Sequence, residues 1–296
     1  MTMPQTALIT ADDPKGRQAV DLFRATYNKL GLDEERAQRL NENGGEFQKG
    51  LKVLIEQLTN PDQFADEEVE SQYGYLSGYS QPKPLAEQAS RLKELFPELA
   101  QTTFDTTIEG EALPPNAEGR FLIPDWRLIA KTYPEAVQVV LDKIKEVRGS
   151  LYNYRDGQID EAHLRQHAKK EEFFLELSKM QSGHNLLVIA AQFGLRHRDK
   201  SVRRARVVMF GGECGLGAFE IGIMLLTHPE RLENVDDLWI DCAGDEFNPG
   251  GGGDFSESPC FGFDDDEVWF GTLVVVDTSD DSGSASVFPP VVSPQQ

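Results

Sequence analysis

The chain has 296 residues, 39% of them hydrophobic, and its 50 acidic side chains against 29 Lys and Arg give a formal net charge of -21. This composition suffices for one or two globular domains, and no stretch approaches the roughly 20 apolar residues of a membrane-spanning helix. The negative charge argues against general nucleic-acid binding, because neutralising phosphates is the largest sequence-independent contribution to such binding.

The first half of the chain shows helical periodicity. Apolar residues recur at Val20, Phe23 and Tyr27, which predicts a helix with one buried face, and Pro14 suits its first turn. The same pattern predicts helices over residues 46–58, ended by Pro61, and over residues 84–96. Three tyrosines within residues 73–84 indicate an ordered connector.

Two longer helices are expected next. The first spans about 125–147, where Pro134 favours a kink, and the second spans about 160–180 with Asp160 as its N-cap. We therefore predict a helical N-terminal module over residues 1–183 and a domain boundary near residue 183.

The pattern changes after this boundary. Short apolar or alternating runs predict a strand from Asn185, a strand or helix interior at 207–210, a buried helix over 215–226 and a strand over 237–242. Residues 258–263 and 267–272 are expected to pair around Asp264-Asp265-Asp266, and residues 273–277 to extend a strand. The fold class is therefore α+β, with a C-terminal α+β domain over residues 184–296.

Residues 196–206 contain six Arg or Lys side chains just before the acidic region. We interpret them as facing the acidic tail of the same chain, because opposite charge nearby lowers the cost of concentrating carboxylates. Phosphate or nucleic acid is the alternative ligand.

Several patterns resemble ligand sites but are incomplete. The glycines of residues 211–217 lack the spacing of a phosphate-binding loop and suit close helix packing. His163 and His167, four apart on the predicted helix, lack the zinc-protease Glu, and the Asp clusters lack the order of a calcium loop. We therefore expect no metal site and no cofactor.

The cysteines and the first residues indicate the compartment. Cys214, Cys242 and Cys260 are odd in number and widely separated, which favours three reduced thiols over a disulfide framework. The first ten residues lack the basic head and apolar run of a signal peptide, so a cytoplasmic location is expected.

The C-terminal segment has an unusual composition. After Arg231 no Lys, Arg or His occurs in 65 residues that hold fifteen Asp or Glu, and Asp, Gly, Ser, Val and Phe fill 31 of the 42 positions of 247–288. Its aromatic content exceeds that of a disordered acidic segment, which predicts a folded structure. These aromatics are Trp239, Phe255, Phe261, Phe263, Trp269, Phe270 and Phe288.

Residues 185–296 carry segments that resemble bacterial proteins with a diversified end. The segments stand at 188–194, 201–206, 222–232, 237–246 and 283–286. Such ends are similar to the variable proteins of diversity-generating retroelements, and this resemblance implies a C-type-lectin-like scaffold that displays varied residues for ligand binding. In those systems template adenines are miscopied, so AAY codons become NNY codons, which do not encode Lys, Gln, Glu, Met or Trp. Residues 247–288 contain only Glu257, Glu267 and Trp269 from that set.

The leading hypothesis is a non-enzymatic binding protein with a variable C-terminal surface. Phenylalanines would anchor a protein or other macromolecular ligand, and Ser, Gly and Asp would supply adaptable polar contacts, with the acidic balance favouring a basic partner. The expected surface comprises Asn248, Asp254, Phe255, Ser256, Ser258, Cys260, Phe261, Phe263, Asp264, Asp265, Asp266, Val268, Phe270, Leu273, Val275, Asp277, Ser279, Asp280 and Asp281.

The alternative hypothesis is a hydrolase-type enzyme. It would use Asp241, Asp245 or Glu246 near Arg203 and Arg204 on a phosphorylated or cationic substrate. This hypothesis requires the carboxylates and the arginines to line one concave pocket.

Overall fold

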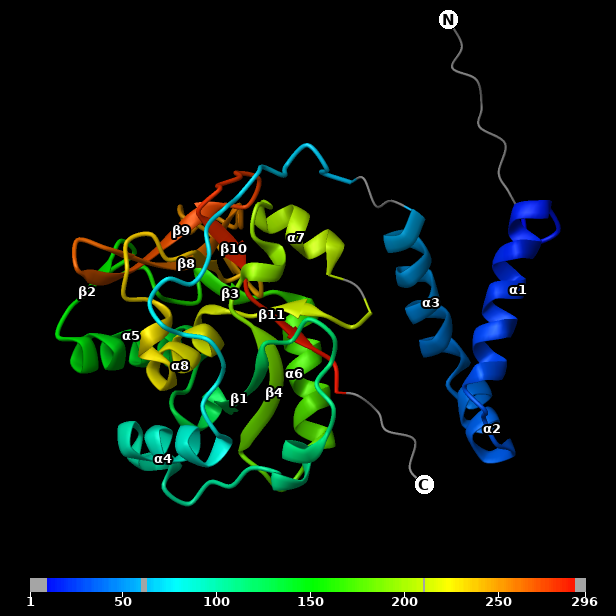
Figure 1. Cartoon of the computed structure of the whole chain (residues 1–296), viewed down its shortest axis with the longest axis horizontal. Coiled ribbons are helices and arrows are strands. Elements are labelled where there is room, and N and C mark those ends of the chain that lie inside the picture. The colour runs from blue at the N-terminus through cyan, green and yellow to red at the C-terminus, as the bar shows by residue number, and fades with distance from the viewer. Residues whose placement is uncertain (1–9, 60–62, 210, 291–296) are drawn as a thin grey trace, which may run out of the picture. The chain divides into compact units, whose positions relative to one another are not determined.

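The computed structural model describes residues 10–59, 63–209 and 211–290 (Figure 1). The chain divides into two compact units, residues 1–58 and residues 59–296. The second unit combines helices with two sheets, which confirms the α+β class.

The first unit consists of the helices α1 (Pro14–Lys29), α2 (Glu34–Glu42) and α3 (Gly44–Thr59). Pro14 stands in the first turn of α1 as expected, and the Asp33 carboxylate caps α2 by accepting a hydrogen bond of 2.8 Å from the Arg36 amide. No residue of α1 or α2 is buried, so the apolar face predicted for α1 stays largely open, with Phe23 43% exposed. Pro61, the expected helix terminator, lies outside the described residues.

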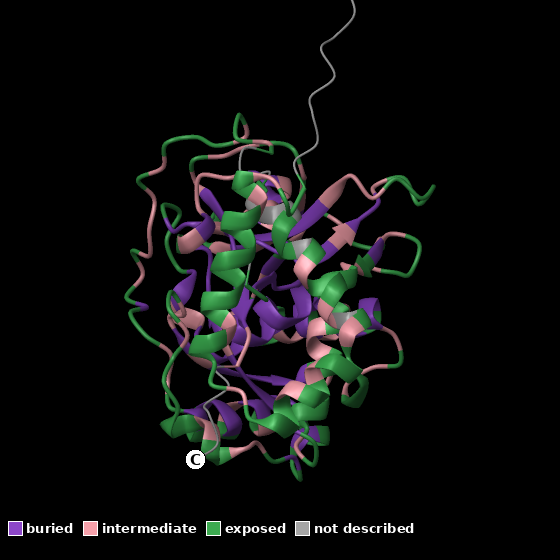
Figure 2. Cartoon of the chain, turned by 90° about the vertical axis from the view of Figure 1, so that its right-hand side faces the viewer, coloured by how far each residue is buried: buried purple, intermediate pink, exposed green. Residues whose placement is uncertain are grey.

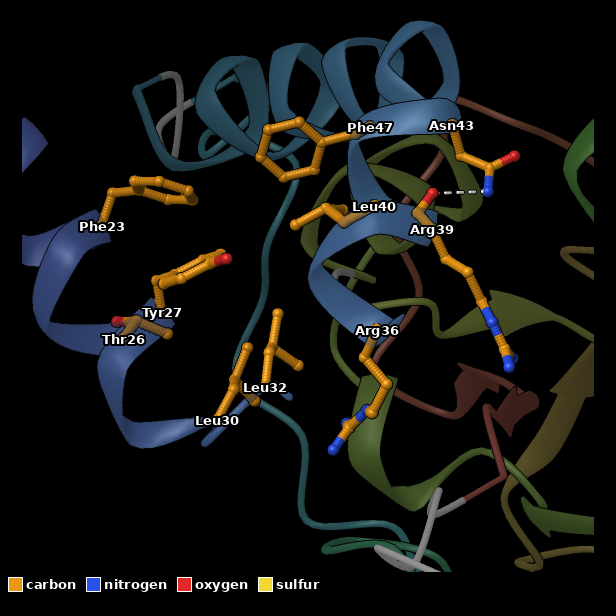
Figure 3. A pocket seen from close by; sticks show the side chains of 10 residues that line it. All are labelled: Phe23, Thr26, Tyr27, Leu30, Leu32, Arg36, Arg39, Leu40, Asn43 and Phe47. Carbon is orange, nitrogen blue, oxygen red and sulfur yellow. Dashed lines mark hydrogen bonds between the residues drawn. The ribbon is translucent and has the colours of Figure 1, made fainter. Parts of the chain in front are cut away.

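An apolar pocket lies among these three helices (Figure 3). Phe23 and Tyr27 reach it from α1, Leu40 from α2 and Phe47 from α3. The ring centroids of Phe23 and Phe47 lie 5.9 Å apart, so α1 and α3 are in contact here.

The second unit contains two sheets. The four-stranded sheet is antiparallel, in the order β1 (Gly119–Pro124), β4 (Leu186–Gln192), β11 (Ser286–Phe288) and β5 (Cys214–Gly215). The seven-stranded sheet has the path β10 (Ser282–Ser284), β6 (Trp239–Asp241), β8 (Glu257–Asp264), β7 (Asp245–Phe247) and β3 (Leu164–Gln166), while β9 (Glu267–Val274) pairs with β8 and with β2 (Leu151–Asn153). Within it the pairs β10–β6 and β2–β9 are parallel and the other pairs are antiparallel.

The α-helices of the second unit, over its described residues, are α4 (Leu85–Leu95), α5 (Tyr133–Arg148), α6 (Ala168–Met180), α7 (Val202–Val208) and α8 (Ala218–Thr227). Short 3-10 helices lie at Pro97–Leu99, Thr106–Gly110, Trp126–Leu128, Leu195–His197 and Pro229–Arg231. All ten residues of α8 are buried, which confirms the buried helix expected there. Figure 2 shows the buried residues concentrated in the central strands and helices of this unit.

Two predicted helix starts are wrong. The first helix begins at Tyr133 rather than near 125, because Thr132 and Glu135 form a capping box, and Pro134 stands in the first turn without producing a kink. The second begins at Ala168 rather than near 160, because its N-cap is His167 and the preceding residues form β3.

The predicted boundary near residue 183 does not separate two compact units. Strand β1 pairs with β4 along six residue pairs, and β2 and β3 join the sheet that contains β8 and β9. Strands and helices from residues 63–183 therefore share one core with the C-terminal part, and the predicted all-helical module over residues 1–183 is wrong. Local periodicity missed β1, β2 and β3, whose pairing partners are distant in sequence.

Other local predictions are confirmed. Strands β4 and β6 lie where apolar and alternating runs indicated them, and β8 and β9 form the expected antiparallel hairpin. Asp265 and Asp266 adopt positive φ values of 46° and 61° at its turn, which Asp tolerates better than most residues. Val207 and Val208 end α7, whereas Phe210 lies outside the described residues.

The connector over residues 73–84 is ordered, as expected. The Tyr75 hydroxyl donates a hydrogen bond of 2.6 Å to Glu118, and Tyr79 is buried. The guanidinium of the fully buried Arg231 lies 3.8 Å from the centroid of the Tyr75 ring. Tyr79 therefore belongs to the core, and the partly buried Tyr75 packs against it.

Candidate functional site

The seven-stranded sheet buries one of its faces in the core. Phe261 and Phe270 stand opposite each other in the β8–β9 register, with ring centroids 5.0 Å apart and no exposed surface. Ile240, Phe247 and Val268 belong to the same apolar cluster. These residues hold the sheet against the helices.

Four aromatic side chains form a second cluster, in which Tyr152 belongs to β2, Tyr154 to the turn after β2, Trp239 to β6 and Trp269 to β9. Successive side chains of a strand point to opposite faces, so Trp269 points away from the buried Phe270. The Trp269 ring centroid lies 5.2 Å from that of Tyr152, 5.8 Å from that of Tyr154 and 5.5 Å from that of Trp239. Tyr152 is 45% exposed and Tyr154 is 56% exposed, whereas both tryptophans are partly buried. We call Tyr152, Tyr154, Trp239 and Trp269 the aromatic face.

Two glycines allow the tryptophan rings to lie close to the backbone of the sheet. A Cβ atom at Gly262, which pairs with Trp269, would lie 2.3 Å from atoms of the Trp239 ring. A Cβ atom at Gly271 would lie 2.7 Å from the Trp269 ring. Both distances are too short for any other residue type without movement of the ring, so the glycines help to fix the geometry of the aromatic face.

Unpaired carboxylates lie on the same strands and on the loops that join them. Among the described residues of 247–290, only Glu257 forms an ion pair, with Arg155. The side chains without one in the described part of the chain are Asp254, Asp264, Asp265, Asp266, Glu267, Asp277, Asp280 and Asp281. Asp264, Asp265, Asp266 and Glu267 lie at the turn end of the β8–β9 hairpin, whereas Asp254 and Asp277 lie beyond its other end, so negative charge lies at both ends of the hairpin.

The predicted surface residues separate into two groups. Phe261, Phe270, Val268, Cys260, Ser258 and Asn248 are buried, so the prediction that they contact a ligand is wrong for this structure. Their side chains fill the core or bond the backbone, as the Ser258 hydroxyl does with the Cys242 carbonyl at 2.9 Å. The remaining predicted residues are exposed or partly buried: Asp254, Phe255, Ser256, Phe263, Asp264, Asp265, Asp266, Leu273, Val275, Asp277, Ser279, Asp280 and Asp281.

The basic cluster of residues 196–206 pairs with carboxylates outside the acidic tail. Arg203 pairs with Glu67, and the Arg196 and His197 side chains meet Glu213 at 3.1 Å and 2.7 Å. Arg204 pairs with Glu68, which belongs to the same segment as Glu67. The prediction that this cluster is neutralised by carboxylates of the same chain is confirmed. The predicted partners in the acidic tail are wrong, because residues 67 and 68 lie against α7 instead.

The residues of the alternative enzyme hypothesis do not converge. The Asp241 carboxylate is buried beside the Ser282 hydroxyl at 3.2 Å, and burial raises its pKa to about 7. Glu246 pairs with Arg165 at 2.7 Å, whereas Asp245 lies in a separate buried cluster. Because Arg203 and Arg204 bind Glu67 and Glu68, these side chains do not share one pocket.

That buried cluster centres on Lys170, a residue that no local sequence pattern marks as functional. The Lys170 ammonium lies 2.9 Å from Asp245 Oδ1, 2.9 Å from Glu220 Oε2 and 2.7 Å from the Tyr133 hydroxyl. Burial lowers the pKa of Lys170, but the two carboxylates outweigh it and leave that pKa raised. The backbone amide of Ala218 also donates to Asp245 at 2.7 Å.

The cluster ties α5, α6, α8 and β7 together. Lys170 and Asp245 have no exposed surface, and all three donors of the ammonium are used. A Cβ atom at Gly217 would lie 2.4 Å from both Lys170 Nζ and Asp245 Oδ1, which supports close packing as the role of this glycine. The arrangement is therefore a structural core cluster without an open position for a ligand.

The candidate metal ligands are also separated by the fold. His163 lies in a turn with its Nδ1 atom 2.7 Å from Asp160, whereas His167 caps α6. The prediction that they share one helix is wrong. No group of three or more His, Cys, Asp or Glu side chains suited to a metal ion occurs in the described ranges.

Cys214, Cys242 and Cys260 are buried free thiols, in agreement with the expected reduced state.

Among the helices that the structure describes, none combines the length and apolar character needed to cross a bilayer. No protein-family model, curated protein or solved structure gives a significant match to this chain.

Proposed function

We propose that this chain is a binding protein and that the aromatic face, with the loops beside it, is its recognition surface. The observation that carries the proposal is the contact of two tyrosines and two tryptophans outside the core, with Tyr152 and Tyr154 about half exposed. Contiguous exposed aromatic surface is typical of interaction sites, because it would bury apolar area on binding.

In this proposal the aromatic face is a rigid contact surface, and the loops beside it adapt to the ligand. Tyr and Trp side chains provide large contact areas at low conformational-entropy cost, and here they are held by strands and by contacts with each other. The Gly-rich residues 250–256 and the loop over residues 275–281 would add polar contacts, since loops tolerate sequence change better than strands do.

The proposal includes diversification by a retroelement on a C-type-lectin-like scaffold. A varied position must tolerate many side chains, so variation would be confined to the accessible residues 254–256, 263–266, 273, 275, 277 and 279–281. The buried Phe261 and Phe270 would stay constant, because replacing a core Phe by a small side chain costs about 3–5 kcal/mol.

Sequencing the flanking DNA tests the diversification. We expect a near-copy of the tail-coding segment beside a reverse transcriptase gene, with adenines at the accessible positions and NNY codons in the expressed copy. Ordinary codons and no such copy would remove diversification from the proposal and leave the binding surface to be tested directly.

Selection from a random peptide library tests the surface itself. We expect peptides enriched on the wild-type chain to lose at least roughly tenfold in affinity on Trp269→Ala, since truncating a central aromatic residue removes about 1.4 kcal/mol or more. Phe23→Ala, an exposed aromatic residue of the first unit, is the matched control and should leave binding unchanged. Peptides that bind Trp269→Ala as well as wild type would contradict the proposal.

A further inference from the structure

The chain itself shows which chemistry suits the aromatic face. The guanidinium carbon of Arg155 lies 5.0 Å from the centroid of the Tyr154 ring, and the same side chain pairs with Glu257. Arg155 thus combines the Tyr154 ring with a carboxylate partner, and its guanidinium carbon also lies 5.0 Å from the centroid of the buried Phe247 ring. Elsewhere in the second unit the same combination recurs, with Arg165 at 3.6 Å from the Phe255 ring and paired with Glu246.

Unpaired carboxylates border both tryptophans. Glu267 lies two residues before Trp269 on β9, so both side chains are on the same side of the sheet. The Asp264-Asp265-Asp266 turn immediately precedes Glu267 at this end of the hairpin. At the other tryptophan, the Trp239 amide donates a hydrogen bond of 2.8 Å to the Asp281 carbonyl, which places residues 280 and 281 beside it.

We infer that the aromatic face binds arginine side chains of a basic peptide segment, each held between a ring and one of these carboxylates. The inference rests on the proposed function and names its ligand class. A guanidinium stacks on aromatic rings and pairs with carboxylates through a planar set of donors, which an ammonium does less well. Carboxylates carry negative charge and accept hydrogen bonds but do not donate them, so this border favours a cation over an anion.

The spacing of the rings sets the spacing of the arginines. Tyr152 and Trp239 stand three strands apart, which is about 14 Å at the usual strand separation. An extended segment rises about 3.3 Å per residue, so roughly four to five residues span the face. Arginines at alternate positions would point to the same side of such a segment.

The test is a titration of the full chain with an eight-residue peptide of alternating Arg and Gly. Binding is measured by tryptophan fluorescence and by calorimetry. Matched Lys-Gly and Glu-Gly peptides are the comparisons. We expect the Arg peptide to bind severalfold tighter than the Lys peptide, and the Glu peptide to show no binding. Trp269→Ala should weaken Arg-peptide binding about tenfold, whereas Trp269→Phe should retain most of it.

A charge variant separates specific contacts from general attraction. Replacing Asp264, Asp265 and Asp266 by Asn should weaken binding roughly threefold to tenfold, whereas replacing the exposed Glu98, Glu109 and Glu111 by Gln removes the same charge and should change binding less than twofold. Equal weakening by both sets, or Arg-peptide binding that ignores Trp269→Ala, would overturn the inference. Failure of the Arg peptide while library-selected neutral peptides still depend on Trp269 would overturn only the ligand class. Failure of both would also overturn the proposed function.

Discussion

The two units of this chain use apolar surface in opposite ways. Residues 1–58 carry eight Lys or Arg and nine Asp or Glu, whereas the rest of the chain carries 21 and 41. In the nearly neutral first unit, neither α1 nor α2 buries a residue, while α8 of the second unit is buried along its whole length. Helix capping and contacts between residues close in sequence therefore provide much of the stability of the first unit, whereas packing between residues distant in sequence stabilises the second.

The comparison also separates two kinds of exposed aromatic residue. Phe23 and Tyr27 line a pocket from α1 (Figure 3), whereas Tyr152 and Trp269 are fixed by strand pairing on a sheet. Only the second set is bordered by a dense group of carboxylates without ion pairs in the described part of the chain. Fixed geometry together with charge makes the second set the better candidate for specific recognition.

The largest expected effect comes from breaking the core cluster of the second unit. Lys170→Met should destabilise this unit by about 3–5 kcal/mol, because it leaves Asp245 and Glu220 buried without their cation. Denaturant unfolding followed by tryptophan fluorescence measures this loss, since all three tryptophans belong to the second unit. The exposed neighbour Lys169→Met is the control and should change stability by less than about 0.5 kcal/mol. Equal stability of the two variants would refute the role given to Lys170.

A buried acid gives the second unit a distinctive pH dependence. Because the folded-state pKa of Asp241 is raised to about 7, its contribution to stability is complete below its unfolded pKa near 4 and is lost as pH rises through 7. Asp241→Asn should remove this term, so we expect the variant to gain stability relative to wild type, by a few kcal/mol, between pH 4 and pH 8. Unfolding at several pH values measures the difference. A difference that does not change with pH would show that folding does not raise the pKa of Asp241.

A smaller effect is expected from disturbing the aromatic face. Gly262→Ala places a methyl group where the Trp239 ring lies, so the ring must move, at a cost of about 1–3 kcal/mol. Near-ultraviolet circular dichroism and tryptophan emission should both change. Gly252→Ala, in a loop where an added Cβ meets nothing within 4 Å, is the matched control. Unchanged spectra in Gly262→Ala would mean that Trp239 is not packed on this glycine.

The smallest effect is expected in the first unit. Phe23→Ser should leave the unfolding transition of the second unit within about 0.5 kcal/mol of wild type, because Phe23 is 43% exposed and the units are separate compact bodies. Tryptophan fluorescence reports the second unit alone and so measures this directly. A shift larger than about 1 kcal/mol would show that the two units are energetically coupled.

Local patterns were sufficient for several elements of this fold. The continuous apolar run of α8 predicts a buried helix, Pro14 marks the start of α1, and Asp264-Asp265-Asp266 marks the β8–β9 turn. Each signal depends on neighbouring residues in the chain, so a sequence window contains all of it. The candidate site was predictable only in part, since the acidic loops were identified but Tyr152 and Tyr154 were not.

Tertiary structure decided what distant residues do together. Nothing in the sequence near Lys170 indicates that it meets Asp245, 75 residues away, and nothing near Tyr152 indicates a partner at Trp269. Trp269 and Phe270 are adjacent on β9 and point to opposite faces of the sheet, so composition alone does not say which of them is buried. The sequence by itself determined the local turns and the helical or alternating periodicity. Strand register and core packing determined which face of the sheet is buried, because a face is removed from water only when the helices pack against it.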